Sequence, residues 1–397
     1  MSNTHREQSD VMMLESPFHS RVKAANELNE WDCWAGYTTP TKYFDVELEY
    51  FAVRSTTGVF DLSPMNKYSI TGPDAQAYLD RVMTRNISKI NVDRVGYSVW
   101  CDDAGQVMDD GTIFRLAENE YRLCAYARAM DWLSWCAMGF DVNIEDVSDQ
   151  VAALAVQGPT SCSCLKAMGL EGIENLKPFG IAHFDFDGED LMVSRTGFTG
   201  DLGYELWITP HKAEAMWDAL FSAGESYMIK PIGSLALELT RIETGFLQAG
   251  VDFVPAQDAV RLGRSRSPFE LGLGWLVDMN KPVFNGKQAL LREQREGSRY
   301  RFVILDVDGN KPAHNSFIYQ GKGKVGTVTS AAWCPTAKSN VAFAQIEMPY
   351  GEVGDDLVAE IYYERELHWT RVMAPCKVIE SAVFNPPRRR QTPAPAY

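Results

Sequence analysis

The chain has 397 residues, of which 45% are hydrophobic and 23% charged, and its formal net charge is -15. This length exceeds one ordinary hydrophobic core, so we expect two or three domains. The acidic balance argues against nucleic acid and anionic membranes as partners, and no apolar run approaches the roughly 20 residues that span a bilayer. The polar N-terminus shows no signal peptide, and eight irregularly spaced cysteines without a CxxC pair predict free thiols in the cytoplasm.

The first two-thirds of the chain mixes helical and strand patterns without regular βαβ alternation, which predicts an α+β fold. The predicted elements are, in chain order, helices at 18–30 and 43–57, a strand and a helix within 65–84, an antiparallel meander at 95–126, a helix at 127–139, two strands within 141–157, a helix starting near Pro159, strands within 184–208, and helices at 211–223 and 231–244.

After about residue 285 the chain turns to short strands with the spacing of a small antiparallel barrel or sandwich. The predicted strands are 301–308, 315–320, 324–331, 340–347, 357–363 and 367–378. The segment "GKGKVG" (321–326) matches a dinucleotide-binding pattern, but a β-like sequence follows it, so we interpret it as a hairpin turn. The six histidines show no paired spacing, and no metal site is expected.

Two pairs of aspartates stand out in "WCDDAGQVMDDGTIFRL" (100–116). Asp102 and Asp103 precede Ala-Gly and predict a turn. Asp109 and Asp110 lie inside an apolar run, and because strand side chains alternate, one of them must point to the buried side. A buried carboxylate is costly unless something pairs with it, so this position is a candidate functional site.

Eight motifs in the same order resemble the glycine-cleavage T-protein (aminomethyltransferase) family. They are "AVRSTTGVFDLSPM" (52–65), "YSVWCDDAGQVMDD" (97–110), "ALAVQGP" (153–159), "KPFG" (177–180), "TGFTGDLGYE" (196–205), "RIETG" (241–245), "FNGKQAL" (284–290) and "GTVTSAAWCPT" (326–336). The resemblance extends from Pro17 to about Ile379 and implies a three-domain cloverleaf around a central folate channel, the last domain being a small antiparallel β-barrel.

The resemblance also implies domain boundaries. Residues 1–62 and 150–250 form a discontinuous folate-binding first domain, and residues 63–149 with 251–284 form a second domain that carries Asp109. Residues 285–380 form the barrel. The Pro- and Arg-rich tail at 381–397 is expected to be flexible.

Site residues follow from the motif positions. The resemblance places Asp109 next to folate N5, where a carboxylate could accept or orient a proton, and assigns Asp110 to a structural or solvent-facing position. The resemblance implies that Glu205 holds the pterin edge, where one carboxylate faces two adjacent N–H groups. It places Tyr97 and Tyr204 at the cofactor, and Arg241 near the folate or the carboxylates. An ion pair of Arg241 with Glu238 or Glu243 is the structural alternative.

Several positions depart from the T-protein pattern. Tyr126 replaces an asparagine that faces the reacting centre, Trp100 replaces Met or Leu, and Met65 follows a proline that replaces histidine. Trp34 and Tyr37 add aromatic side chains ahead of Pro40. Aromatic walls suit an onium methyl donor through cation–π attraction, or a methoxylated ring through stacking, so Trp100, Tyr126, Tyr37 and Met65 are candidate substrate-binding residues.

These departures resemble the dimethylsulfoniopropionate demethylase branch. They imply a methyltransferase that moves a methyl group from a small sulfonium or quaternary ammonium donor to tetrahydrofolate, with no metal and no flavin. The alternatives are the aminomethyltransferase of glycine cleavage, whose acidic carrier the charge of -15 would repel, and a folate-binding protein without turnover. The partner expected is the small-molecule methyl donor, and the chain is expected to be a monomer or a homodimer.

Overall fold

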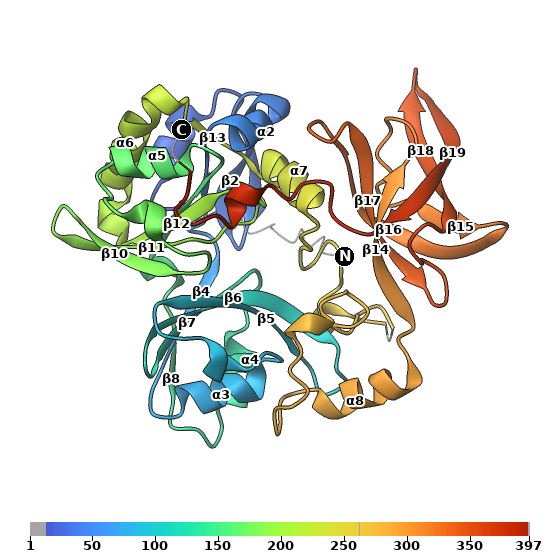
Figure 1. Cartoon of the computed structure of the whole chain (residues 1–397), viewed down its shortest axis with the longest axis horizontal. Coiled ribbons are helices and arrows are strands. Elements are labelled where there is room, and N and C mark those ends of the chain that lie inside the picture. The colour runs from blue at the N-terminus through green and yellow to red at the C-terminus, as the bar shows by residue number, and fades with distance from the viewer. Residues whose placement is uncertain (1–12, 262, 396–397) are drawn as a thin grey trace, which may run out of the picture.

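The computed structural model describes residues 13–261 and 263–395. Figure 1 shows three lobes: two mixed α/β domains and a β-barrel. The predicted α+β class and the C-terminal barrel are both confirmed.

The first domain contains a six-stranded sheet in the order β10-β11-β12-β9-β3-β13. Its strands are β3 (Gly58–Asp61), β9 (Ala152–Gln157), β10 (Ile181–Phe186), β11 (Glu189–Ser194), β12 (Gly203–Ile208) and β13 (Lys230–Pro231). The surrounding helices are α1 (His19–Ala25), α2 (Val46–Ser55), α5 (Ser161–Ala167), α6 (Ala213–Gly224) and α7 (Ser234–Thr244). A separate hairpin joins β1 (Glu30–Trp34) to β2 (Tyr37–Lys42). This hairpin differs from the helix predicted up to residue 30, because α1 ends at Ala25 and the chain turns there.

The second domain is a five-stranded antiparallel sheet in the order β5-β6-β7-β4-β8, with two helices on one face. The strands are β4 (Asn66–Thr71), β5 (Arg94–Cys101), β6 (Val107–Ala117), β7 (Glu120–Ala125) and β8 (Asn143–Asp146), and the helices are α3 (Ala75–Val82) and α4 (Met130–Cys136). Strands β5 and β6 are joined by the predicted turn at Asp102, where the N–H of Gly105 donates to the Asp102 carbonyl.

The third domain is a closed barrel in the order β14-β17-β16-β15-β18-β19. Its strands are β14 (Tyr300–Val307), β15 (Phe317–Gln320), β16 (Gly323–Cys334), β17 (Ser339–Glu347), β18 (Asp356–Arg365) and β19 (His368–Ile379). The "GKGKVG" segment lies at the β15–β16 hairpin, which confirms the turn interpretation. Helix α8 (Lys287–Glu296) leads into the barrel.

Short 3-10 helices complete the chain. They are η1 (Ile87–Lys89), η2 (Ser148–Gln150), η3 (Ile173–Asn175), η4 (Pro210–Lys212), η5 (Glu225–Tyr227), η6 (Ala256–Asp258), η7 (Gly274–Leu276) and η8 (Pro387–Arg389).

The C-terminal tail does not extend freely into solvent, contrary to its predicted flexibility. The described part of the tail leaves the barrel and runs back across α7 to the first domain (dark red in Figure 1). The Phe384 N–H donates to the Glu243 carbonyl on α7, and Ala394 is 6% exposed within the core of the first domain. The sequence pattern missed this because the tail is held by polar contacts and a few separate apolar side chains, such as Val383 and Ala394, rather than by a periodic apolar face.

Buried apolar clusters join the domains. One cluster lies between the two sheets and includes Phe114 and Cys124 from the second domain with Ala155 and Trp207 from the first. Another combines Val99 of β5 with residues of α7 and the barrel. The face of β5 and β6 that is turned away from α3 and α4 is therefore the surface on which the domains meet.

A buried ion pair lies at this junction. The Arg241 guanidinium on α7 donates to the Asp252 carboxylate at 2.7 Å, and both side chains are fully buried. Asp252 also accepts hydrogen bonds from the hydroxyls of Thr329 and Ser330 on β16, at 2.7 and 2.6 Å. The first domain and the barrel are thereby fixed to the segment that follows α7.

Replacing this arginine should cost much of the folding stability. Arg241→Gln leaves the Asp252 carboxylate buried without a cation, and the expected loss is about 3–5 kcal/mol in the free energy of unfolding. Urea unfolding at pH 7 measures it. Arg301→Gln, which removes the more exposed Arg301–Glu352 pair, is the matched control and should cost below about 1 kcal/mol. Equal losses in the two variants would contradict the role assigned to the Arg241–Asp252 pair.

Candidate active site at the sheet interface

Glu205 projects from β12 towards the second domain. In the β12–β9 register it lies opposite Ala155, which belongs to the cluster between the sheets. Trp207 points the same way, with its ring 5.1 Å from that of Phe114 on β6. Because side chains alternate along a strand, Tyr204 points to the other side, where it is fully buried against the helices of the first domain.

The Glu205 carboxylate is held by hydroxyl groups alone. Thr196 Oγ1 and Ser194 Oγ donate to Oε2, at 2.5 and 3.4 Å. Among the residues that the structure describes, Glu205 forms no ion pair with a lysine or arginine. Burial raises the pKa of Glu205 to about 7, and the two hydroxyl groups only partly oppose this. Such a carboxylate has unused acceptor capacity and gains stability from any N–H donors that reach it.

The glycine-rich loop before β12 fits closely around Gln157. Its amide nitrogen donates to the carbonyls of Thr196 and Tyr204, at 3.1 and 3.2 Å, and its amide oxygen accepts from Thr199 Oγ1 at 2.9 Å. A Cβ at Gly197 or Gly203 would lie 2.0 or 2.1 Å from that oxygen. The glycines in "TGFTGDLGYE" therefore allow Gln157 to hold the loop that carries Thr196.

The two aspartates face opposite sides of the sheet by ordinary alternation, and a β-bulge on β6 determines which side each one faces. Trp100 pairs with Asp109, but Cys101 pairs with Val107, so Met108 is the extra residue. Asp110 pairs with Val99 and faces the domain junction, whereas Asp109 lies on the side of α3 and α4. The sequence predicted one buried carboxylate and assigned Asp110 to a structural or solvent-facing position; the structure gives Asp110 the more open place at the junction.

Asp109 is 1% exposed and is bound by backbone N–H groups. The Asp110 N–H donates to Oδ1 at 2.8 Å, and the Ala127 N–H donates to Oδ2 at 3.0 Å. Burial and the neighbouring Asp110 carboxylate raise the pKa of Asp109 well above its usual range, although both N–H groups oppose the shift. A proton-binding carboxyl group at neutral pH is suited to acid–base chemistry.

Asp110 pairs with Tyr97 on the junction face. The Tyr97 hydroxyl donates to Asp110 Oδ2 at 2.7 Å. Burial raises the pKa of Asp110, and the Asp252 carboxylate adds to the rise. The exposed Trp275 of η7 lies beside Tyr97, with 6.2 Å between ring centroids. Nothing in the motif comparison singled out Trp275.

Glu205 and Asp110 both lie near the paired strands β6 and β7 of the second domain. Burial raises the pKa of the Cys124 thiol to about 12, and the Glu205 carboxylate contributes to that shift. Cys124 pairs with Thr112 on β6, two residues from Asp110 on the same face, a distance of about 7 Å along a strand. The structure thus brings Glu205, Tyr97 and Asp110 to one junction.

An aromatic pair lies close to Asp109. The rings of Trp34 and Tyr126 stack with centroids 6.3 Å apart, and Tyr126 is 42% exposed. Tyr126 immediately precedes Ala127, whose N–H binds Asp109. The Trp34 indole N–H has no hydrogen-bond partner among the described residues. Trp34, which the sequence marked only as an additional aromatic, thus joins Tyr126 as a candidate ligand contact.

The remaining candidate residues are Trp100, Tyr37, Met65 and Arg241. Trp100 is 1% exposed in the core beneath α3, and Tyr37 is buried with its hydroxyl donating to Asp149. Met65 packs at the edge of the cluster between the sheets. Arg241 uses its guanidinium for Glu238, Asp252, Ser330 and the Phe246 carbonyl, so the ion-pair alternative with Glu238 is the one observed. We therefore place no ligand contact on Trp100, Tyr37, Tyr204 or Arg241.

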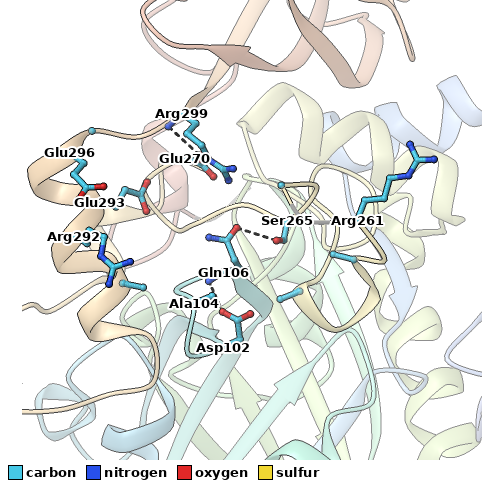
Figure 2. Close-up of a pocket in the computed structure, with 15 residues that line it drawn as sticks. Asp102, Ala104, Gln106, Arg261, Ser265, Glu270, Arg292, Glu293, Glu296 and Arg299 are labelled. Carbon is cyan, nitrogen blue, oxygen red and sulfur yellow. Dashed lines mark hydrogen bonds and ion pairs between the residues drawn. The ribbon is translucent and has the colours of Figure 1, made fainter.

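Two surface cavities lie apart from these residues. The first, of about 460 Å³, lies between the Asp102 turn, residues 256–261 and 263–270, and α8, as Figure 2 shows. Its charges are partly paired, with Arg299 beside Glu270 at 3.5 Å. The second, of about 620 Å³, reaches Asp252 from the barrel side. In the described part of the chain, no cluster of His, Cys, Asp and Glu could hold a metal ion, and no helix is long and apolar enough to cross a membrane.

Two protein-family models match consecutive parts of the chain. Residues 19–281 match the GCVT N-terminal domain, and residues 300–376 match the glycine cleavage T-protein C-terminal barrel domain. The aminomethyltransferase of Caldanaerobacter subterraneus subsp. tengcongensis is 32% identical over 82% of this chain and 86% of its own length. That of Bacillus subtilis is also 32% identical, over 83% and 90%.

A third relative carries a different name. The trimethylamine-oxide aldolase of Ruegeria pomeroyi is 36% identical over 77% of this chain, which spans only 39% of that longer protein. The crystal structure of aminomethyltransferase T from Bartonella henselae shares the fold, with a TM-score of 0.82 and 23% identity over 94% of this chain and 98% of that one. The chain therefore belongs to the glycine-cleavage T-protein family, whose members are tetrahydrofolate-dependent one-carbon transferases.

Proposed function

We propose that this protein moves a methyl group from a small sulfonium or quaternary ammonium donor to N5 of tetrahydrofolate. The observation that carries the proposal is Glu205, a carboxylate at the domain junction that is held by two hydroxyls and has no cationic partner among the described residues. A pterin edge offers a ring N–H and an amino group side by side, which a carboxylate accepts in a bidentate manner. Family membership supplies tetrahydrofolate as the ligand with that edge.

Two carboxylates are available for the proton at N5. We propose Asp109, the residue that the T-protein resemblance assigns, as the acid–base group. Its raised pKa supports this role, whereas its enclosure by backbone N–H groups supports a structural one. Asp110 with Tyr97 faces the junction directly, and is the competing candidate. The substitutions below separate the two.

The aromatic pair supports a cationic donor. Trp34 and Tyr126 present stacked rings one residue from the N–H that binds Asp109, and rings attract onium groups through cation–π interaction. When N5 takes the methyl group of such a donor, the bond from the methyl carbon to sulfur or nitrogen breaks and a neutral sulfide or amine departs, so the leaving group needs no acid. The name of the Ruegeria pomeroyi relative, an aldolase of a methylated amine oxide, favours methylated nitrogen compounds as the substrate class.

The aminomethyltransferase activity of glycine cleavage is the second candidate. It is favoured by relatives of that name that are 32% identical over most of this chain. The two candidates differ in the donor. Incubating the protein with tetrahydrofolate and a panel of sulfonium and ammonium donors should yield 5-methyl-tetrahydrofolate by mass spectrometry, and turnover only with an aminomethylated lipoyl carrier would favour the second.

Folate binding should depend on Glu205. Glu205→Gln places an amide N–H₂ against a pterin edge that offers donors, so tetrahydrofolate affinity should fall by about 1.5–3 kcal/mol. Calorimetry measures it. Because the carboxylate is the binding form, wild-type affinity should weaken as pH falls below about 7, and the variant should lose this dependence. Unchanged affinity in Glu205→Gln would remove the residue from the pterin site.

Asp109→Asn and Asp110→Asn separate the two carboxylates. Loss of an acid–base group lowers kcat by roughly 10²–10⁴-fold, and we expect this for Asp109→Asn. An amide N–H₂ there must also face a backbone N–H, so the free energy of unfolding should fall by about 1–3 kcal/mol. Rates are therefore normalised to folded protein by circular dichroism. A large kcat loss in Asp110→Asn alone would transfer the role to Asp110.

Donor binding should depend on Tyr126. Tyr126→Asn restores the T-protein residue and removes one ring of the Trp34–Tyr126 pair. The donor's KM should rise at least about tenfold while tetrahydrofolate affinity stays within about twofold, because only the donor contact is lost. Tyr362→Asn removes an exposed tyrosine of the barrel and should leave both values unchanged. An unaltered donor KM in Tyr126→Asn would place the donor elsewhere.

A further inference from the structure

The C-terminal tail binds the loop that leads into Glu205. This tail lies beyond residue 376, where the match to the family's barrel domain ends. Two of its contacts fall on the two ends of the loop between β11 and β12, at Arg195 and Asp201. The loop also supplies Thr196, the strongest hydrogen-bond donor to Glu205.

At the far end of the loop, Arg388 closes a bidentate ion pair with Asp201. The distances are 2.6 Å from Nε to Oδ1 and 2.7 Å from Nη2 to Oδ2. The Asp201 side chain is fully buried, and its Oδ1 also accepts from the Leu202 N–H at 2.7 Å. Planar pairing of this kind fixes orientation as well as distance, so the tail determines where the chain enters β12.

At the near end of the loop, Arg195 binds the tail backbone. Its guanidinium donates to the Gln391 carbonyl at 2.7 Å and to Thr392 Oγ1 at 3.1 Å, and it also reaches the Leu176 carbonyl. The next residue is Thr196, whose hydroxyl donates to Glu205. The residue held by the tail and the residue that holds Glu205 are thus adjacent in the chain.

The middle of the loop is covered by stacked side chains. Phe198 stacks on Phe246 with centroids 5.6 Å apart, and the Arg389 guanidinium lies 5.0 Å from the centre of the Phe246 ring. Gly200, with φ of +72°, lies in the left-handed region that glycine adopts without strain. A loop with this freedom needs outside contacts to hold one conformation, and Gln157 and the tail supply them from different directions.

We propose that Arg388 is a positioning residue for Glu205: by binding Asp201 it holds the 195–203 loop so that the Glu205 carboxylate is presented to the pterin edge. This rests on the proposed function, since it takes folate as the ligand of Glu205. Arg388 needs no contact with folate itself. Its effect should therefore appear in folate binding and disappear when Glu205 is removed.

The test uses full-length variants and calorimetric titration with tetrahydrofolate. Arg388→Gln should raise the tetrahydrofolate Kd at least about tenfold, and Arg388→Lys should recover part of the loss. The neighbouring Arg390 is exposed, without an ion pair among the described residues, and Arg390→Gln is the matched control with wild-type Kd. The KM of the methyl donor should stay within about twofold in all three variants.

A double-mutant cycle separates positioning from general loosening. If Arg388 acts through Glu205, Arg388→Gln should add less than about twofold to the Kd of Glu205→Gln. Arg388→Gln alone leaves Asp201 as a buried charge without its ionic partner. A double variant that carries both Arg388→Gln and Asp201→Asn removes both charges and keeps side chains of similar shape. This double variant should fold and show the same raised Kd.

The outcomes distinguish this proposal from the proposed function. Failure of the wild-type protein to bind tetrahydrofolate would overturn both. Tight wild-type binding that is unchanged in Arg388→Gln, or in the double variant if the single one does not fold, would overturn only the role of Arg388. Fully multiplicative effects of Arg388→Gln and Glu205→Gln would do the same, because they would show that the tail acts independently of Glu205.

Discussion

The buried carboxylate of Asp252 is the point on which the relative placement of the domains depends. It accepts four hydrogen bonds, from the Arg241 guanidinium, the Gln248 N–H and the hydroxyls of Thr329 and Ser330. These donors come from α7, the segment that follows it and the barrel. Because a buried charge tolerates little loss of partners, this arrangement fixes the domains to each other and so fixes the junction where Glu205 and Asp110 lie.

The candidate site is made of carboxylates without a cationic partner among the described residues, a feature shared with the buried Asp61, whereas two other buried carboxylates pair with arginine. Glu243 is bound by Arg54 at 2.8 Å, and Asp252 by Arg241. Glu205, Asp109 and Asp110 have hydroxyl and N–H partners instead, and burial raises the pKa of each. This costs stability in the free protein, and such a cost is typical of groups that meet their partner only when a ligand binds.

Alternating and amphipathic patterns predicted the sheets and the barrel well, because burial on one face leaves a direct trace in the sequence. The six barrel strands and the 95–126 meander illustrate this. The pattern failed where local geometry depends on single residues. Alternation alone would place Asp109 opposite to Met108, but the bulge turns both towards α3 and α4 and leaves Asp110 at the junction. No periodicity predicts the position of a bulge.

For the same reason, only some of the candidate site residues lie at the junction. Glu205 and Tyr97 reach the junction, but Tyr204 alternates away from it, and Trp100 fills the core beside the bulge. A motif identifies neighbouring letters without saying which side of the strand each one faces. The tail was missed because its contacts pair distant residues, such as Arg388 with Asp201, and a single sequence gives no sign of such a pairing.

The position of Tyr126 connects the departure from the T-protein pattern to Asp109, the proposed acid–base group. The asparagine of that pattern could exchange hydrogen bonds with a neutral amine at the reacting centre, whereas a tyrosine ring offers a π face that attracts a cation. Tyr126 makes this change one residue before the N–H that binds Asp109. The Ala127 N–H makes the same hydrogen bond whatever side chain residue 126 carries. The preference for a methyl donor can therefore change while Asp109 keeps this hydrogen bond. Under the proposed function, the chain thus keeps the folate half of the family's chemistry and exchanges only Tyr126, the side chain proposed to meet the donor.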